Sequence, residues 1–271
     1  MSSSLSGGRA PGRTLVVGFG KLGARLVDPL LDRGDDVIAL RRSKTSLPLG
    51  VTGIGADVAE PLSALPAVDA MAVTLPPGER VDGYRRALSH LAAALPRIPE
   101  RTVFVSSTGV FAGTGPERVL TEQDEPVVAS ERAEALREGE RAARELFGAV
   151  IVRPAGIYGP GRDFLIRRVR EQAPVDHRRW TNRIHESDLV RTIDLLLRMP
   201  SPPPLVHAVD TRAVLLGEVV AHIAARLHVE IPPDTVAESE SGHILDGALL
   251  HGLLGPLKYP TFESGYDAML R

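Results

Sequence analysis

A glycine-rich turn between a strand-like and a helix-like segment constrains the fold of this 271-residue chain most strongly. Residues 14–17 (TLVV) form a short apolar, β-branched run that is typical of a buried parallel strand. Leucines then recur at helical spacing through residues 22–31, and Gly34 ends that segment. Between the two stands Gly18-Phe19-Gly20-Lys21-Leu22-Gly23, a GxGxxG motif. In this strand–turn–helix context the motif predicts a dinucleotide-binding βαβ unit.

Each glycine of the motif has its own task in such a unit. Gly18 allows the tight turn, Gly20 lets the backbone approach a pyrophosphate, and Gly23 lets helix and strand pack closely. The helix N-terminus offers free N–H groups to the phosphates, and Lys21 adds positive charge beside them. We therefore expect residues 18–23, with Phe19 and Leu22 among them, to form the pyrophosphate side of a cofactor site.

The second strand indicates which dinucleotide to expect. Residues 36–40 (DVIAL) read as this strand, and it ends in Arg41 and Arg42. NAD sites usually place an acidic residue about 20 residues after the glycines to hold the ribose 2′-hydroxyl, whereas NADP sites use Arg there for the 2′-phosphate. Asp35 and Asp36 stand at the wrong end of the strand for that task. Unless the two arginines only cap a strand end in solvent, the cofactor is NADP(H) rather than NAD.

Composition narrows the class of protein. With 43% hydrophobic residues the chain can bury one sizeable core, or a core with a small appended lobe. A net charge of −2 and a pI near 6.5 argue against binding to nucleic acid or to a membrane surface. The absence of cysteine excludes disulfides, thiolate metal sites and cysteine nucleophiles. Residues 1–12 are Ser/Gly-rich and read as a disordered tail, and no apolar run could span a bilayer, so we expect a cytoplasmic protein.

Strand-like and helix-like segments alternate along the chain, which predicts an α/β fold. The expected strands are 51–58, 68–75, 101–106, 149–153 and 205–209, and the expected helices are 80–95, 130–147, 186–198 and 216–227. This order is that of a Rossmann-type, doubly wound parallel sheet. We expect one domain over residues 13–271, in which residues 160–271 contribute a small C-terminal substrate lobe.

Several segments resemble the extended or atypical short-chain dehydrogenase/reductases, often labelled NAD-dependent epimerase/dehydratase. Residues 105–111 (VSSTGVF) look like the family's SSxxVYG, residues 153–161 (RPAGIYGPG) are nearly its RPxxIYGPG, and residues 182–189 (NRIHESDL) are similar to its xxIHVDDLA. The glycine loop differs, since GxxGxxG is the spacing usual in that family. These segments stand in the family's order over residues 14 to about 190.

The resemblance implies further cofactor contacts and a quaternary structure. Asp57 would contact the adenine, and Leu75 with Pro76 would flank the ribose. Ser106 would lie beside the cofactor, as would Pro154 and Ile157 from the segment along the nicotinamide. Family members commonly form homodimers by pairing the helices that here are 80–95 and 130–147.

The family's catalytic Tyr-x-x-x-Lys pair is missing from this chain. The only lysines are Lys21, Lys44 and Lys258, and no tyrosine stands between Tyr84 and Tyr158. The chain therefore lacks the residues for that family's usual mechanism of ketone reduction, whereas the segments expected to bind the cofactor are present.

Other residues stand where that pair would be. If Glu140 matches the family's helix glutamate, the tyrosine position falls on Arg132 and the lysine position on Leu136. Arg132 stays charged and cannot supply a proton, but it could stabilise an oxyanion or bind a substrate carboxylate.

Three residues are candidates to replace the missing chemistry. The resemblance puts Ser107, with Thr108 beside it, where the family positions the substrate carbonyl, and we expect a functional role there. Tyr158 and Glu131 are open to two interpretations: each could transfer a proton, or Tyr158 could pack the sheet edge and Glu131 face solvent near a helix N-terminus.

The remaining polar and charged residues that could carry chemistry have a structural interpretation, either alone or beside a functional one. His185 belongs, by resemblance, to the scaffold, with Asp188 nearby to fix a loop; no metal-site spacing and no GxSxG motif is present. An Arg-rich run could bind a phosphate or carboxylate of a substrate, or form a solvated helix face. It comprises Arg167, Arg168, Arg170, His177, Arg178, Arg179 and Trp180. The apolar segment 244–254 could cover a pocket, but core packing is the simpler interpretation.

Together these features predict an NADP(H)-dependent oxidoreductase or epimerase/dehydratase-like enzyme, acting on a small polar carbonyl or imine metabolite with non-standard acid/base residues. Two alternatives stay open: a dinucleotide-binding sensor or scaffold without redox chemistry, and a non-redox lyase or isomerase with Arg132 as electrostatic stabiliser. Fold alone does not choose among them.

Overall fold

A computed structural model describes residues 12–42, 46–78, 80–127, 129–235 and 241–271. Residues 1–11 of the predicted tail and Lys44 lie outside these ranges. Gly12, the last residue of that predicted tail, is described: its amide donates a hydrogen bond to Asp35 (3.2 Å) and its carbonyl accepts one from Asp36 (3.0 Å).

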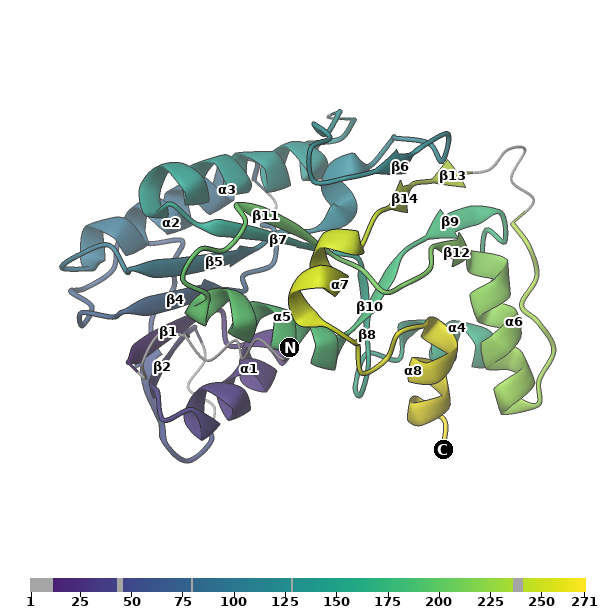
Figure 1. The fold of residues 1–271 in the computed structure, drawn as a ribbon, viewed down its shortest axis with the longest axis horizontal. Coiled ribbons are helices and arrows are strands. Elements are labelled where there is room, and N and C mark those ends of the chain that lie inside the picture. Colours follow the sequence, from purple (N-terminus) through teal and green to yellow (C-terminus); the bar gives the residue numbers. More distant parts are fainter. Residues whose placement is uncertain (1–11, 43–45, 79, 128, 236–240) are drawn as a thin grey trace, which may run out of the picture. The chain divides into compact units, whose positions relative to one another are not determined.

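The largest element of the fold is a seven-stranded sheet in the order β11-β7-β5-β4-β1-β2-β3 (Figure 1). Its strands are β1 (Arg13–Val17), β2 (Asp36–Arg41), β3 (Val51–Gly55), β4 (Ala70–Val73), β5 (Arg101–Val105), β7 (Val150–Pro154) and β11 (Leu205–Ala208). The strands are parallel, as in the pairing of β1 with β2 and with β4. The predicted Rossmann-type α/β fold is thus confirmed.

The inner strands of this sheet are buried because helices connect them across its faces. Every residue of β4 and β7 is buried, whereas the edge strand β3 is largely exposed. The connecting helices are α1 (Lys21–Asp32), α2 (Gly83–Ala94), α3 (Glu131–Phe147) and α5 (Glu186–Arg198). Strong end signals bound α3: Ser130 accepts a hydrogen bond from the Ala133 amide (3.2 Å), and Gly148 follows in the left-handed conformation.

The chain divides into two compact units that interleave along the sequence. The first unit comprises Met1–Val110, Ser130–Arg153 and Val190–Val206, and the second comprises Phe111–Ala129, Pro154–Leu189 and His207–Arg271. The second unit therefore begins before residue 160 and omits residues 190–206. Which residues form the substrate lobe stays a prediction.

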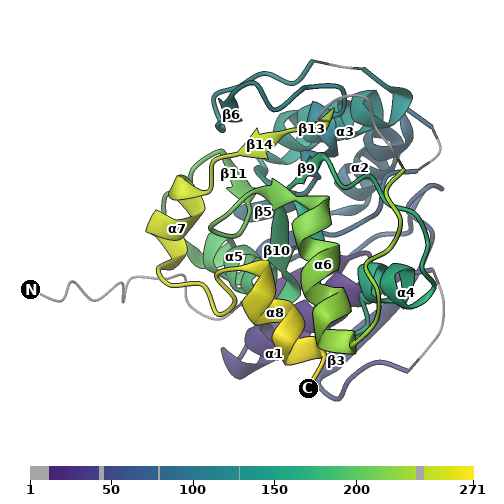
Figure 2. The same cartoon turned by 90° about the vertical axis from the view of Figure 1, so that its right-hand side faces the viewer.

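The second unit is built from short elements around a small apolar core. Its helical elements are η1, a 3-10 helix whose last residue enters this unit (Thr108–Phe111), α4 (Phe164–Arg170), α6 (Leu216–Leu227), α7 (Ala248–Leu254) and α8 (Phe262–Met269). Its strands are β6 (Val119–Leu120), β8 (Gly156–Tyr158), β9 (Arg179–Thr181), β10 (Arg183–His185), β12 (Val214–Leu215), β13 (Ser241–Gly242) and β14 (Ile244–Leu245). They pair as β10-β8, β12-β9-β13 and β14-β6. Helix α6 packs against α4 and α8, which Figure 2 shows from one side.

The helices and strands predicted from residue 186 onward match the observed elements in part. The helices expected at 186–198 and 216–227 and the strand expected at 205–209 correspond to α5, α6 and β11. The apolar segment 244–254 forms β14 and α7 instead of one helix, and within it Leu245 and Leu250 are buried. Packing is thus the role of at least these two side chains.

Candidate functional site

The predicted cofactor residues of the first unit follow neighbouring strands at one edge of the sheet. The glycine turn follows β1, Arg41 ends β2, Asp57 follows β3, and Leu75 follows β4. Since parallel strands end at the same edge, these residues share the carboxyl edge of the sheet. Strand β1 pairs with β2 on one side and β4 on the other, so the glycine turn lies at the topological switch point, where open α/β sheets bind ligands.

The glycine turn has the backbone that the motif predicted. Gly18 has a φ of 88°, a conformation that favours glycine. Its amide donates a hydrogen bond to the Leu40 carbonyl (3.1 Å), and its carbonyl accepts one from the Thr74 hydroxyl (2.6 Å). The turn is therefore tied to the end of β2 and to the residue that follows β4.

Gly20 and Gly23 differ in what surrounds them. A Cβ added at Gly23 would lie 2.5 Å from the Gly18 carbonyl oxygen and 3.2 Å from the Val16 side chain, so only glycine fits between helix and strand. A Cβ added at Gly20 would meet no protein atom within 4 Å. Gly20 precedes α1, whose first turn has no side-chain cap. Exposed backbone and first-turn N–H groups fit a pyrophosphate group.

The end of β2 carries the two arginines that were predicted to hold a 2′-phosphate. Arg41 is half-buried, with its guanidinium carbon 5.6 Å from the centre of the Phe19 ring, and Arg42 is exposed. The acids of β2 are at its other end: Asp36 pairs with Arg13 (2.7 Å), and Asp35 is buried. Burial alone would raise the pKa of the Asp35 carboxyl, but hydrogen bonds from Arg33, Thr14 and Gly12 outweigh it and lower that pKa.

The segment after β4 is held by a tyrosine that sequence reasoning did not select. The Tyr84 hydroxyl, from α2, donates a hydrogen bond to the Leu75 carbonyl (3.0 Å). Its ring packs edge-on against Phe104 (5.1 Å between centroids), and a Cβ on Gly139 of α3 would lie 2.6 Å from it. Burial raises the pKa of Tyr84, so this phenol stays protonated. A tyrosine on the apolar face of a helix was the available signal, because its hydroxyl needs a partner when buried.

The Ser106 side chain takes part in a buried cluster with the ion pair of Glu140 and Arg153. The Ser106 hydroxyl donates to Glu140 of α3 (2.7 Å), and Arg153 of β7 donates two hydrogen bonds to the same carboxylate (2.9 and 2.7 Å). The three residues are 7%, 2% and 4% exposed, respectively. The Ser106 hydroxyl is therefore engaged within the protein, and its predicted cofactor contact would have to use other atoms.

In the turn after Ser106, Gly109 lies next to both Ser107 and Leu136. The Ser107 hydroxyl oxygen accepts a hydrogen bond from the Gly109 amide (3.0 Å). A Cβ on Gly109 would lie 3.3 Å from that oxygen and 3.4 Å from a methyl group of Leu136. Leu136 is fully buried, so an apolar side chain occupies the position that matching Glu140 to the family's helix glutamate would assign to the lysine. Glu131 and Arg132, in the first turn of α3, are exposed.

Tyr158, one of the two candidates for proton transfer that the sequence left open, is a packed core residue of the second unit. It is 2% exposed, stacks on Tyr266 (4.8 Å between centroids) and donates a hydrogen bond to the Thr261 carbonyl (3.3 Å). Burial raises the pKa of Tyr158. These contacts favour the packing interpretation that the sequence left open. Its neighbour Ile157 pairs with Ile184 in the β8–β10 ladder, and Pro154 is the buried last residue of β7.

His185 and Asp188 have the scaffold contacts expected for them. The Asp188 carboxylate is fully buried and accepts hydrogen bonds from the amides of Lys258 (2.8 Å) and Tyr259 (2.9 Å). The His185 ring packs against the Tyr259 ring (3.9 Å between centroids) and contacts the Ser187 hydroxyl (2.8 Å). Burial lowers the pKa of His185 to about 4, so the ring is neutral at pH 7.

The Arg-rich run separates into a short helix and a loop with β9. Arg167, Arg168 and Arg170 lie on α4, where Arg167 pairs with Asp163 (3.6 Å) and Arg168 donates to the Pro174 carbonyl. Arg167 and Arg170 are exposed, as in a solvated helix face. The rest of the run, from His177 to Trp180, precedes and enters β9.

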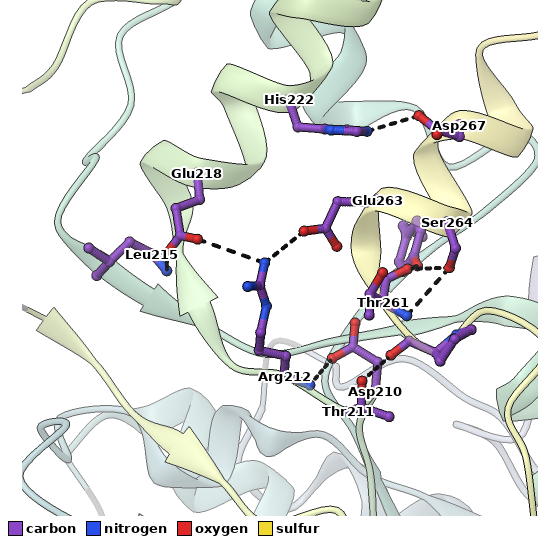
Figure 3. A network of polar contacts seen from close by, with 12 residues as sticks. Asp210, Thr211, Arg212, Leu215, Glu218, His222, Thr261, Glu263, Ser264 and Asp267 are labelled. Atoms are coloured by element: carbon purple, nitrogen blue, oxygen red, sulfur yellow. Dashed lines mark hydrogen bonds and ion pairs between the residues drawn. The ribbon is translucent and has the colours of Figure 1, made fainter.

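A polar network joins the loop after β11 to α6 and α8 within the second unit (Figure 3). Arg212 stands between Glu263 (2.7 Å) and Glu218 (3.8 Å), and its amide donates to Asp210 (3.3 Å). Asp210 is 4% exposed, and burial raises the pKa of its carboxyl to about 7. These contacts fix elements of the second unit to one another.

Neither a membrane-spanning helix nor a metal centre is found in the described residues 12–42, 46–78, 80–127, 129–235 and 241–271. No helix in these ranges is both long and apolar enough to cross a bilayer. No group of three or more metal-ligating side chains in the same ranges is placed to hold an ion.

No protein-family model matches this chain, and neither does any curated protein. Solved structures do match. One from Methylobacillus flagellatus, whose name assigns it to the NAD-dependent epimerase/dehydratases, is 29% identical, with a TM-score of 0.81 and coverage of 97% of this chain and 98% of that one. The chain has the fold of the NAD-dependent epimerase/dehydratase family over nearly its whole length. The resemblance inferred from the sequence motifs is confirmed.

Two further matches share the fold at lower identity. MoeE5, solved with UDP-glucose and NAD, is 23% identical, with a TM-score of 0.77 and coverage of 96% of this chain and 97% of that one. The UDP-glucuronic acid 4-epimerase of Bacillus cereus, solved with UDP-glucuronic acid and NAD, is 15% identical, with a TM-score of 0.73 and coverage of 95% and 98%. The cofactor in both names is NAD, so a preference for NADP(H) rests on Arg41 and Arg42 of this chain alone.

Proposed function

We propose that this chain binds NADP(H) and acts as an oxidoreductase or epimerase/dehydratase-like enzyme on a small polar carbonyl or imine substrate. The observation that carries the proposal is the glycine turn at the switch point, next to Arg41 and Arg42 at the end of β2. The exposed Gly20 backbone and the uncapped first turn of α1 fit a pyrophosphate, and the two guanidinium groups fit a 2′-phosphate. Bound NADP(H) supplies or accepts a hydride.

The remaining cofactor contacts follow from the same edge of the sheet. Asp57, Leu75 and Pro76 follow β3 and β4 at that edge, and Tyr84 fixes the Leu75 carbonyl. We assign the adenine to the side of Asp57 and the ribose to the side of Leu75 and Pro76.

Ser107 is the residue of this site that we assign to the substrate. Its oxygen accepts the Gly109 N–H, which leaves the hydroxyl proton to donate to a substrate carbonyl. No lysine or tyrosine of α3 assists it, because Arg132 and Leu136 stand in those positions. The proton therefore comes from the substrate or water, with the exposed Arg132 as an electrostatic stabiliser. A nucleotide sugar is the first substrate class to test, since the names of two fold relatives include one.

A binding protein without redox chemistry is the second candidate, and two observations favour it. Leu136 fills the lysine position with a buried apolar side chain, and Tyr158 is a packed core residue. A chain that only senses the dinucleotide would need neither acid nor base.

Calorimetric titration with NADPH and NADH tests the cofactor assignment. Charge-assisted hydrogen bonds contribute about 1.5–3 kcal/mol each, so Arg41→Ala or Arg42→Ala should weaken NADPH binding roughly 10- to 100-fold and leave NADH binding unchanged. Arg137→Ala, on the exposed face of α3, is the matched control. Equal or tighter binding of NADH by the parent protein would remove the role given to both arginines.

Turnover distinguishes the enzyme from the binding protein. NADPH oxidation and sugar-nucleotide conversion are followed with a panel of carbonyl compounds and UDP-sugars. If Ser107→Ala abolishes a measured turnover while NADPH affinity is kept, the enzyme assignment holds. If the parent protein binds NADPH tightly and converts no member of the panel, the sensor assignment replaces it.

A further inference from the structure

An aromatic side chain inside the glycine turn lies against one of the arginines assigned to the cofactor. The Arg41 guanidinium carbon is 5.6 Å from the centroid of the Phe19 ring, within the range of a cation–π interaction. Both residues are half-buried, so the contact is partly shielded from water. Phe19 is the residue between the first two glycines of the turn, where a GxGxxG motif requires no particular side chain.

The backbone holds these two side chains in register. Gly18, directly before Phe19, donates its amide hydrogen bond to Leu40, directly before Arg41 (3.1 Å). On its other side, the Arg41 carbonyl accepts a hydrogen bond from the Ala56 amide (3.0 Å), which ties the residue to the end of β3. The Phe19 ring and the Arg41 side chain therefore start from backbone positions that are fixed relative to each other.

An arginine side chain loses rotamer freedom when it binds a phosphate, and this loss weakens binding. A ring that already holds the guanidinium reduces the loss, which is the general benefit of preorganisation. A guanidinium group can lie on an aromatic face while its N–H groups, which point outward in its own plane, donate to another group. The contact with Phe19 is therefore compatible with phosphate binding.

We propose that Phe19 is a specificity-determining residue, which orients the Arg41 guanidinium for a ribose 2′-phosphate and so increases the preference for NADPH over NADH. This inference rests on the proposed function, since it assumes that NADP(H) is the cofactor. Its distinguishing consequence is that Phe19 acts through Arg41. A ring that simply stacks on the adenine would act on NADPH and NADH alike.

A double-mutant cycle on the full-length protein tests the inference by calorimetry with NADPH and NADH. Phe19→Leu keeps an apolar side chain and removes the aromatic face. We expect it to weaken NADPH binding about two- to fivefold, the effect of a partly exposed cation–π contact, with NADH binding unchanged. Phe19→Tyr keeps a ring and should keep the parent ratio. In an Arg41→Ala background, Phe19→Leu should have no further effect on NADPH binding.

Two results would overturn this role of Phe19: an equal loss of NADPH and NADH affinity in Phe19→Leu, or an undiminished effect of Phe19→Leu in the Arg41→Ala background. Unfolding midpoints of the variants show whether the turn is intact. Repeating the cycle with 2′,5′-ADP and 5′-ADP confines the comparison to the 2′-phosphate. A parent protein that prefers NADH would instead contradict the proposed function, and this inference with it.

Discussion

Removal of the buried carboxylate of Glu140 should destabilise the protein far more than removal of an exposed carboxylate on the same helix. Glu140 is 2% exposed and accepts hydrogen bonds from Ser106 and from two nitrogens of Arg153. Glu140→Ala leaves the Arg153 guanidinium, which is 4% exposed, without its carboxylate. Breaking a buried ion pair from one side costs about 3–5 kcal/mol.

Glu145→Ala is the matched control. Glu145 lies on α3 as well, its side chain is 50% exposed, and it pairs with Arg85 (2.8 Å). An exposed pair contributes about 0–1 kcal/mol. At roughly 2–4 °C per kcal/mol for a protein of this size, Glu140→Ala should lower the unfolding midpoint by about 6–20 °C and Glu145→Ala by less than about 4 °C.

Urea and thermal unfolding, followed by circular dichroism, measure both variants. Ser106→Ala should cost only about 1 kcal/mol, because it removes one hydrogen bond and leaves the ion pair. The double variant Glu140→Leu/Arg153→Met, which removes both charges, should recover most of the loss. If Glu140→Ala and Glu145→Ala agree within about 1 kcal/mol, the cluster does not stabilise the fold in the way that its burial implies.

Three other predictions concern the glycine turn, a buried acid and the quaternary structure. Gly23→Ala should lose about 1–3 kcal/mol of stability because its methyl group would clash with the Gly18 carbonyl. Gly20→Ala should cost about 1 kcal/mol or less and chiefly weaken NADPH binding. Unfolding measures the stability of both variants and calorimetry their NADPH affinity, and equal stabilities would contradict this contrast. Because burial raises the pKa of Asp210 from 3.8 to about 7, the folded state retains a proton that the unfolded state loses, and stability should fall as pH rises through this window. Asp210→Asn should remove up to about 4 kcal/mol of that decline. The free energies of unfolding of the parent and the variant are compared between pH 4 and 8, and parallel pH profiles would contradict the raised pKa of Asp210. Light scattering at micromolar concentration should report a homodimer formed through α2 and α3, although the exposed face of α3 is charged. A monomer at that concentration would refute this prediction.

The first unit could be predicted in detail because its signals are local. Strands buried on both faces read as continuous apolar runs, and α3 carries a serine cap, acids in its first turn and a glycine after its last turn. The glycine motif likewise specified its own backbone, as the φ of Gly18 and the space around Gly23 show.

The second unit could be predicted only in part. Its strands are two or three residues long, too short to show a period, and contacts from distant residues hold them. The Asn182 side chain, for example, joins the His243 carbonyl (2.8 Å) and the Leu245 amide (3.0 Å), more than 60 residues away. Tyr84, in the first unit, was missed for a different reason: its apolar position was visible, but its hydrogen bond to Leu75 depends on how α2 packs.

At the position assigned to the missing lysine, the sequence shows which group is absent, and the structure shows what surrounds the leucine that replaces it. The sequence alone excluded a lysine on α3, but only the structure shows that Leu136 is fully buried beside the Ser107 turn. A buried ammonium needs a partner and a polar surrounding, whereas a leucine stabilises α3 against the turn by apolar contact. The surroundings of the Ser107 hydroxyl are therefore less polar than a lysine would make them. If Ser107 binds the substrate carbonyl as proposed, we expect the proton to come from solvent or from the substrate itself, because the buried face of α3 presents Leu136 there.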